Sequence, residues 1–446
     1  MKKKFLNVFY ILALLLVLIV IYSKFFKNIW WDAGVYFGMA KYIYSFGVNG
    51  MWESVRPIGW PLLIGAFWKL GFNIVYTAYI LQVIMFLGLV YLTYLICEEL
   101  FDSKVGFYAS LVLGFNMILF FWMFKSYSDI PSTFFLVLAY YFVIKEKYYF
   151  LAGLSSAFSV LVRYPLAILL IPLGFWLLYE TFKNKNFKNI FFYVLGFSII
   201  ALAFLLFNHN MYGHIFAPIL EGFVSIGWNK GNPLIFESNL LLPLLTIILS
   251  FNIMIIFLFY GFYKIVKNQK FDYRIKLLTL ALLLFLVFLE VIKLKEERYL
   301  IPIFFILSIF VGYGLSKIGY KLANSLCLVY IIIFLLSLSQ FFIFSQDAAT
   351  TQNFYSGGVP VDVLDVCPFY SEIASSNPIA AVYWDKVQPY YGNWSDEIII
   401  GQENSIQCVF YSSCDFSGGL SHFVFRGYTE FYKSNDTCDF RIFINT

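Results

Sequence analysis

Charged residues are scarce in this chain, and the signatures of common soluble enzymes are absent. Only 13% of the 446 residues are charged, whereas 61% are hydrophobic, and an aqueous fold has too little interior to hide that much apolar surface. The sequence contains no P-loop, no GxGxxG before a helix, no HExxH and no GxSxG elbow. These absences argue against nucleotide-binding, zinc-protease and serine-hydrolase classes and predict an integral membrane protein.

Histidines and closely spaced cysteines are also few. The three histidines are scattered, and no two of the six cysteines form a CxxC pair, so no metal site is predicted, although a divalent metal is left open. Cys97 and Cys327 lie at or in apolar runs and are expected to be buried thiols. The other four cysteines lie in the polar tail, where an even number favours two disulfides in an oxidising compartment over a zinc site. They are Cys367, Cys408, Cys414 and Cys438.

Apolar runs predict about eleven transmembrane helices. The predicted spans are Phe5–Ile21, Ile74–Ile96, Val105–Phe124, Ile130–Ile144, Tyr148–Val162, Leu166–Tyr179, Ile190–Phe207, Leu240–Tyr263, Leu277–Ile292, Leu300–Leu315 and Leu322–Phe344. A first external loop, residues 22–73, mixes aromatic, charged, Gly and Pro residues, as interfacial helices do. We therefore expect an α-helical polytopic membrane domain over residues 1–344.

Residues 345–446 are expected to form a small α/β domain, because short β-rich runs alternate there with turn residues. The runs are Ile379–Trp384, Cys408–Tyr411, Phe423–Phe425 and Phe440–Ile444. This tail carries a net charge of −8. Because the whole chain carries +5, the membrane part carries +13. The basic surplus lies in short loops rather than in one patch, which favours the positive-inside rule over nucleic-acid binding. An odd number of crossings from an inside N-terminus puts the tail outside the cytoplasm.

Two carboxylates are candidates for catalysis. Asp32 lies among aromatic residues in the segment WWDAGVY, where partial desolvation is expected to raise its pKa and suit it to accept a proton. The alternative is that Asp32 caps the helix that follows it. Asp129 precedes Ile130 and Pro131, which is also good helix-capping chemistry.

Arginines on the predicted external side are candidates for binding an anion. Arg56 is followed by two prolines in RPIGWP, Arg163 lies at the turn between two short spans, and Arg298 directly precedes an apolar span. A guanidinium group matches the geometry of phosphate oxygens. Three uncompensated arginines gathered at the external face would repel each other, so an anion such as a lipid phosphate is expected among them. Snorkelling at a helix start is the alternative for Arg56. Mutual ion pairing is the alternative for the loop KLKEERY, which holds Glu296 and Glu297 besides Arg298.

Together these elements resemble the GT-C class of membrane glycosyltransferases, in particular the protein mannosyltransferase and aminoarabinose transferase branch. The matching stretches come in the expected order. They are WWDAGVY from Trp30, RPIGWPLLIG from Arg56, the stretch that begins with AGL at Ala152 and ends at Arg163, NHNMYGHIF from Asn208, and RYLIP from Arg298. The match covers Trp30 to about Leu315 and leaves the tail out. Many relatives carry a second acid directly after the first, and Ala33 stands there in this chain.

The resemblance implies a multi-pass enzyme of the cell envelope that transfers a hexosyl or pentosyl group from a polyprenyl- or dolichyl-phosphate donor. The acceptor would be a protein, lipid or glycan at the external face. Asp32 would be the base, with Asp129 as a second candidate catalytic acid, and the substrate would contact Tyr36, Arg56, Arg163, Arg298 and Tyr299. A transporter or flippase of lipid-linked sugars and a non-catalytic membrane scaffold are the alternative functions.

Overall fold

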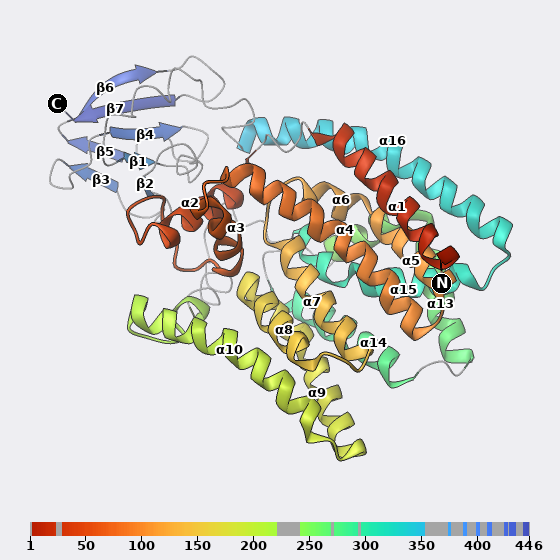
Figure 1. The fold of residues 1–446 in the computed structure, drawn as a ribbon. Helices are drawn as coiled ribbons and strands as arrows, with labels where there is room; N and C mark the ends of the chain where they lie inside the picture. The colour runs from red at the N-terminus through yellow and green to blue at the C-terminus, as the bar shows by residue number, and fades with distance from the viewer. Residues whose placement is uncertain are drawn as a thin grey trace.

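The computed structural model describes residues 2–23, 29–220, 241–268, 272–292 and 296–352, together with seven strands between residues 373 and 445. Most of the described chain is helical (Figure 1). The helices are α1 (Lys2–Ile21), α2 (Trp31–Tyr44), α3 (Gly59–Lys69), α4 (Ile74–Leu100), α5 (Ser103–Gly114), α6 (Met117–Met123), α7 (Asp129–Ile144), α8 (Tyr149–Val162), α9 (Ala167–Asn184), α10 (Phe187–Tyr212), α12 (Leu241–Phe251), α13 (Ile255–Lys267), α14 (Tyr273–Val291), α15 (Ile301–Ser316) and α16 (Tyr320–Gln352). Short 3₁₀ turns η2 (Tyr164–Leu166), η3 (Asn252–Met254) and η4 (Glu297–Leu300) precede α9, α13 and α15.

A helix or a pair of consecutive helices covers each of the eleven predicted spans. Within the described residues, six helices are long and apolar enough to cross a membrane, and a seventh crossing results if one bent pair is a single span. The helical, multi-pass character is thus confirmed, and the count of about eleven crossings stays a prediction. The first loop contains the helices α2 and α3, as its composition indicated.

The predicted span Val105–Phe124 is not one straight helix. It breaks into α5 and α6, which meet at an angle of 60°. The break has a local cause, because Phe115 and Asn116 leave the helix and the Asn116 side chain accepts a hydrogen bond from the Leu119 backbone N–H, at 3.1 Å. An asparagine that caps a new helix in this way competes with continuation of the old one.

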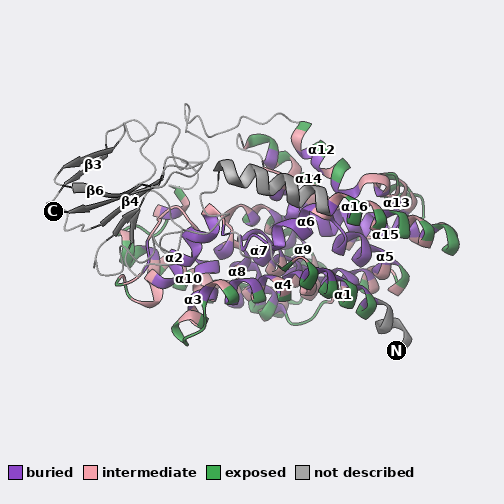
Figure 2. Cartoon of the chain, turned by 90° about the horizontal axis from the view of Figure 1, so that it is seen from above, coloured by how far each residue is buried: buried purple, intermediate pink, exposed green. Residues whose placement is uncertain are grey.

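One continuous apolar core fills the bundle (Figure 2), and α15 is buried in it. Every residue from Ile301 to Leu315 is buried, so this helix is apolar all round, as expected of a helix surrounded by others. The outer helices differ. On α10 the apolar side chains Phe191, Ile199, Leu202 and Leu206 are exposed, which is the surface that lipid would cover.

Two pairs of helices pack so closely that glycine is required at the contact. A Cβ on Gly153 of α8 would collide with the carbonyl oxygen of Tyr193, and a Cβ on Gly196 of α10 would collide with that of Phe150. Gly261 of α13 and Gly314 of α15 form an equivalent pair. Small residues at such crossings let helix backbones approach each other, which is a main source of packing energy in lipid.

Replacing Gly153 by alanine is therefore expected to destabilise the protein by about 1–3 kcal/mol through overpacking. Gly174 in α9 is the matched control, because no atom lies within 4 Å of the position that its Cβ would occupy. Gly174→Ala should leave stability unchanged or raise it slightly. Thermal unfolding of both variants in detergent tests this, and equal melting temperatures would contradict the packing argument.

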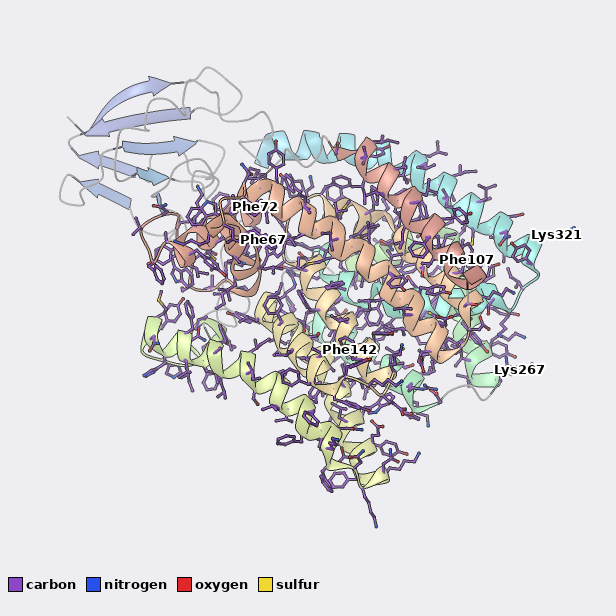
Figure 3. All side chains as sticks on the ribbon, viewed as in Figure 1. Phe67, Phe72, Phe107, Phe142, Lys267 and Lys321 are labelled. Atoms are coloured by element: carbon purple, nitrogen blue, oxygen red, sulfur yellow. The ribbon has the colours of Figure 1, made fainter. Side chains whose placement is uncertain are left out.

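The loops expected on the cytoplasmic side gather at one end of the bundle. Lys267, the last residue of α13, and Lys321, at the start of α16, are at the same end as the N-terminus, whereas Phe67 and Phe72 near α3 are at the opposite end (Figures 1 and 3). This arrangement agrees with the predicted orientation, in which residues 22–73 form the first external loop. The orientation in the membrane itself stays a prediction.

The described part of the tail consists of strands. A five-stranded sheet has the order β2 (Val387–Pro389), β1 (Ile373–Ser375), β4 (Cys408–Ser412), β7 (Phe440–Asn445) and β6 (Tyr428–Lys433). It is mixed, because β1 runs parallel to both its neighbours and β7 antiparallel to its own. The strands β3 (Ile398–Gly401) and β5 (Phe423–Arg426) form a separate parallel pair.

Three of the four predicted β-rich runs thus coincide with β4, β5 and β7. The fourth, Ile379–Trp384, lies outside the described residues, as do Cys367, Cys414 and Cys438. The α/β character, the disulfides and the domain boundary at 344/345 stay predictions, and α16 continues past that boundary to Gln352. Cys97 and Cys327 are buried free thiols, as expected.

Candidate active site

The first element of the site is the start of α2, which is buried from Asp32 through Lys41. The Asp32 carboxylate receives two guanidinium groups, from Arg56 Nη2 at 2.9 Å and from Arg298 Nη1 at 2.8 Å. Asp32 is the second residue of the helix, and the N-cap residue is Trp30, whose side chain makes no capping hydrogen bond. The capping alternative for Asp32 is therefore wrong, because the carboxylate binds arginines rather than backbone amides.

Arg56 reaches Asp32 from the loop that precedes α3. Its Nε also donates to Oε1 of Glu53, three residues earlier, at 2.9 Å. The loop is held against α8, because a Cβ on Gly59 would lie 2.7 Å from backbone atoms of Leu161 and Val162. Only glycine permits that approach, which brings the Arg56 loop to the end of α8 where Arg163 follows. Arg56 is thus part of an ion-pair cluster rather than a snorkelling anchor.

Asp129 enters the site from a tightly held turn between α6 and α7. Its Oδ1 lies 3.1 Å from Arg163 Nη1, and its Oδ2 lies 3.9 Å from Arg298 Nη1. Ser128 just before it bonds to the Tyr36 hydroxyl at 3.0 Å and accepts from Arg163 at 3.5 Å. The N-cap residue of α7 is Ser128, whose side chain makes no capping hydrogen bond, and neither Asp129 carboxylate oxygen accepts one among the described residues, so the capping alternative is wrong here also.

Arg298 connects the two carboxylates. It is 9% exposed, its Nε lies 2.6 Å from Glu296 Oε2, and its guanidinium carbon is 4.6 Å from the ring centre of Tyr127. The ring of Tyr299 lies near both guanidinium groups. Its centre is 5.0 Å from the guanidinium carbon of Arg163 and 5.6 Å from that of Arg298. The predicted site residues, which are spread over 268 positions from Asp32 to Tyr299, are therefore brought together.

The charges of this cluster differ from expectation. From the sequence, three uncompensated arginines were expected to repel each other and so to require an external anion. The structure corrects this, because Arg56 pairs with Asp32 and Glu53, Arg163 with Asp129, and Arg298 with Asp32 and Glu296. Four carboxylates accompany three guanidinium groups. Any phosphate must therefore compete with carboxylates that belong to the protein.

The expected rise in the pKa of Asp32 is also corrected. Burial alone would raise the pKa of this carboxyl, but the adjacent guanidinium groups of Arg56 and Arg298 outweigh burial and hold the pKa below its ordinary range. Asp32 is thus an anion throughout the physiological range. Its affinity for a proton is weak while both arginines are bound to it.

Several residues of the site carried no recognisable sequence signal. The rings of Trp122 and Tyr127 lie against the guanidinium group of Arg298. The ammonium group of Lys125 lies against the ring of Trp30, two residues before Asp32. Lys125 stands in the run FKSYSD, which matches no motif, and it becomes notable only through its burial. Glu53 had a weak signal, since acids three residues from an arginine often pair with it. Lys293 and Lys295 lie outside the described residues.

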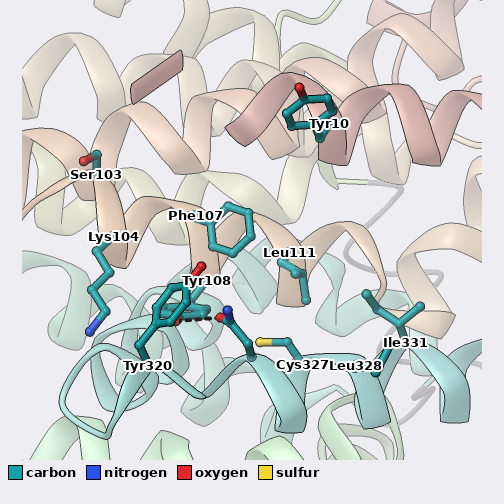
Figure 4. A pocket seen from close by; sticks show the side chains of 11 residues that line it. Tyr10, Ser103, Lys104, Phe107, Tyr108, Leu111, Tyr320, Cys327, Leu328 and Ile331 are labelled. Carbon is teal, nitrogen blue, oxygen red and sulfur yellow. Dashed lines mark hydrogen bonds between the residues drawn. The ribbon is translucent and has the colours of Figure 1, made fainter. Parts of the chain in front are cut away.

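No group of three His, Cys, Asp or Glu side chains that could hold a metal ion is found in the described parts of the chain. A separate cavity of about 530 Å³ lies between α1, α5 and α16 (Figure 4). Its lining includes Lys104, Tyr108, Asn324 and Cys327, and the Tyr108 hydroxyl donates to Asn324 Oδ1 at 3.0 Å. None of its lining residues belongs to the acid–arginine cluster.

A family of known proteins matches part of the chain. Residues 55–226 match the family described as dolichyl-phosphate-mannose-protein mannosyltransferase, a segment that contains Arg56, Asp129 and Arg163 but neither Asp32 nor Arg298. No curated protein matches the chain by sequence.

Several solved structures share the fold at low identity. ArnT from Cupriavidus metallidurans bound to undecaprenyl phosphate is 10% identical, with a TM-score of 0.69 over 98% of each chain. The apo oligosaccharyltransferase of Archaeoglobus fulgidus is 12% identical, with a TM-score of 0.55 over 99% of this chain and 74% of its own. The family match over residues 55–226 and the shared fold confirm that the chain resembles the GT-C class of membrane glycosyltransferases, as its five short motifs indicated.

Proposed function

We propose that the protein transfers a sugar from a polyprenyl- or dolichyl-phosphate donor to an acceptor at the external face of the membrane, with Asp32 as the base. The observation that carries the proposal is the shared carboxylate of Asp32, which contacts arginines from two segments more than two hundred residues apart. Buried ionic clusters of this kind are costly in a membrane protein and mark functional sites. The family match and the fold shared with a protein bound to undecaprenyl phosphate support the choice of donor.

The proposed reaction is a displacement with inversion at the anomeric carbon. The acceptor hydroxyl loses its proton to the Asp32 carboxylate, and its oxygen forms a bond to the anomeric carbon. The bond from that carbon to the phosphate oxygen breaks, and its electron pair leaves with the lipid phosphate. Guanidinium groups stabilise the charge that develops on the leaving group.

This mechanism requires the arginines to change partners. In the structure Arg56 and Arg298 hold Asp32, whereas the mechanism needs them on the phosphate and needs Asp32 free to bind a proton. When the phosphate takes over the guanidinium groups, the interaction that lowers the pKa of Asp32 weakens. Donor binding thus turns a weak base into a better one, and the acceptor is deprotonated only when the donor is present.

The external location of the reaction depends on the orientation of the chain, which the tail cysteines test. Labelling of Cys367, Cys408, Cys414 and Cys438 with a membrane-impermeant thiol reagent on intact cells is expected only after addition of a reductant. Thiols that react without reductant and only in permeabilised cells would put the tail in the cytoplasm. The proposed side of the reaction would then be wrong.

Mass spectrometry of glycans from cells with and without the protein tests the proposed activity. Loss of one defined hexose or pentose from a protein, lipid or glycan is expected, with restoration by the wild-type gene and not by the Asp32→Asn variant. Restoration by that variant would contradict a transferase that uses Asp32. The alternatives of a transporter or a scaffold would require no base, and no contact in the described residues favours them.

A further inference from the structure

Under the proposed function, the site has too little positive charge for the phosphate of the donor. All three arginines of the site already bind carboxylates, and the four acids outnumber them. A phosphate that displaces one carboxylate from an arginine leaves that carboxylate unpaired in a buried environment, which is costly. A further cation near the cluster would remove this cost.

Lys125 is a cation of this kind. It is 2% exposed, and among the described residues its ammonium group makes no ion pair and no hydrogen bond. The ammonium nitrogen lies 3.9 Å from the ring centre of Trp30 and 4.5 Å from that of Phe121. Aromatic faces attract a cation but replace only part of its hydration, and burial lowers the pKa of Lys125 to about 7.

The turn that carries Lys125 is firmly attached to the site. Trp60 Nε1 donates to the carbonyl of Ser126 at 2.9 Å, and Gln82 Nε2 donates to that of Tyr127 at 2.5 Å. Ser126 has a φ of +56°, a strained value for a residue other than glycine. The same turn supplies Asp129. Two separate helices, α3 and α4, therefore hold the turn in a conformation that puts Lys125 four residues from a carboxylate of the site, with no ion pair to the lysine among the described residues.

One aromatic cluster, made of Trp30, Phe121, Trp122 and Tyr127, joins Lys125 to Arg298. Lys125 contacts the first two rings and Arg298 the last two. Within the cluster the centroid of Trp30 is 5.7 Å from that of Trp122, and the centroid of Trp122 is 5.4 Å from that of Tyr127. Trp30 also stands two residues before Asp32, so this one aromatic cluster touches Lys125, Arg298 and the chain next to the base.

We propose that Lys125 is a substrate-binding residue that supplies the additional positive charge for the phosphate of the lipid-linked donor. A buried lysine with no ion pair among the described residues is poorly stabilised by aromatic rings alone, which makes it receptive to an anion. Its compact ammonium group can accompany the phosphate while the arginines exchange partners. The inference rests on the proposed function and names one more residue that contacts the donor.

The test compares binding of undecaprenyl phosphate and of uncharged undecaprenol to the purified full-length protein in nanodiscs. Lys125→Met keeps the length and apolar stem of the side chain and removes the charge. It should weaken undecaprenyl phosphate binding about tenfold or more, since a hydrogen bond between charged groups is lost, and should leave undecaprenol binding unchanged. Lys317→Met is the matched control, because Lys317 also lies on an aromatic ring, 4.6 Å from the centre of Tyr313.

The melting temperature of each variant distinguishes a binding role from a purely structural one. Lys125→Met should melt no lower than the wild type, because it removes a buried charge. If it binds undecaprenyl phosphate as tightly as the wild type, Lys125 only stabilises the Trp30 ring and the inference is wrong. Lys125→Gln gives the same answer if the methionine variant does not fold. A wild-type protein that does not bind undecaprenyl phosphate would overturn the proposed function, and this role with it.

Discussion

Replacement of Asp32 by asparagine is expected to reduce sugar transfer by about 10²- to 10⁴-fold, which is the usual contribution of a general base. Asparagine keeps the shape of the side chain but does not bind a proton at neutral pH. The variant should still bind the lipid phosphate, and as tightly as the wild type or more so. The reason is that Arg56 and Arg298 no longer have the Asp32 carboxylate as a competing partner.

This pair of measurements separates loss of the base from collapse of the cluster. Removal of a buried charge leaves two arginines partly uncompensated, and this destabilises the fold. If the variant were merely misfolded, binding and transfer would fall together. Transfer near the wild-type rate in a folded Asp32→Asn protein would instead show that Asp32 is structural.

Replacement of Arg298 by lysine is expected to reduce donor use by about 10- to 100-fold, although the charge is kept. The guanidinium group of Arg298 contacts Asp32 through Nη1 and Glu296 through Nε and Nη2. A single ammonium group does not reproduce that fork. Arg298→Gln, which also removes the charge, should have the larger effect, and acceptor affinity should change little in either variant.

Arg274→Lys is the matched control for this prediction. Arg274 also pairs with a carboxylate, that of Asp272 at 3.0 Å, but it lies at the start of α14, in a segment predicted to face the cytoplasm. Steady-state kinetics with varied donor concentration should show no change in this control. If both Arg298 substitutions left donor kinetics unchanged, the pairing of Arg298 with Glu296 and Asp32 would be purely structural.

The positions of the helices could be predicted because the length of an apolar run is a property of the sequence alone. The exceptions have local causes that the sequence shows only weakly, such as Asn116, which caps α6 and bends the predicted span. Five charged residues of the ion-pair cluster could also be selected from the sequence as candidates, because charge is costly in a membrane protein and therefore rare. Asp32, Asp129 and the three arginines were found in this way.

The partners of these residues could not be predicted. From the sequence, Asp32 is a carboxylate among tryptophans, and burial dominates its expected pKa. In the structure two guanidinium groups lie within 3 Å of it and reverse the direction of the shift. These contacts join residues 24 and 266 positions apart, and no local pattern encodes them. Lys125 could not be predicted for the same reason, since only its position against Trp30 distinguishes it from other lysines.

The most direct test of the account follows an isotopically labelled sugar on a polyprenyl phosphate in proteoliposomes that contain the purified protein and membrane acceptors from cells lacking it. The account predicts that label moves to the acceptor while free polyprenyl phosphate accumulates in equal amount, and that neither happens with Asp32→Asn. A donor that crosses the bilayer with its sugar still attached, without release of polyprenyl phosphate, would contradict a transferase and identify a transporter.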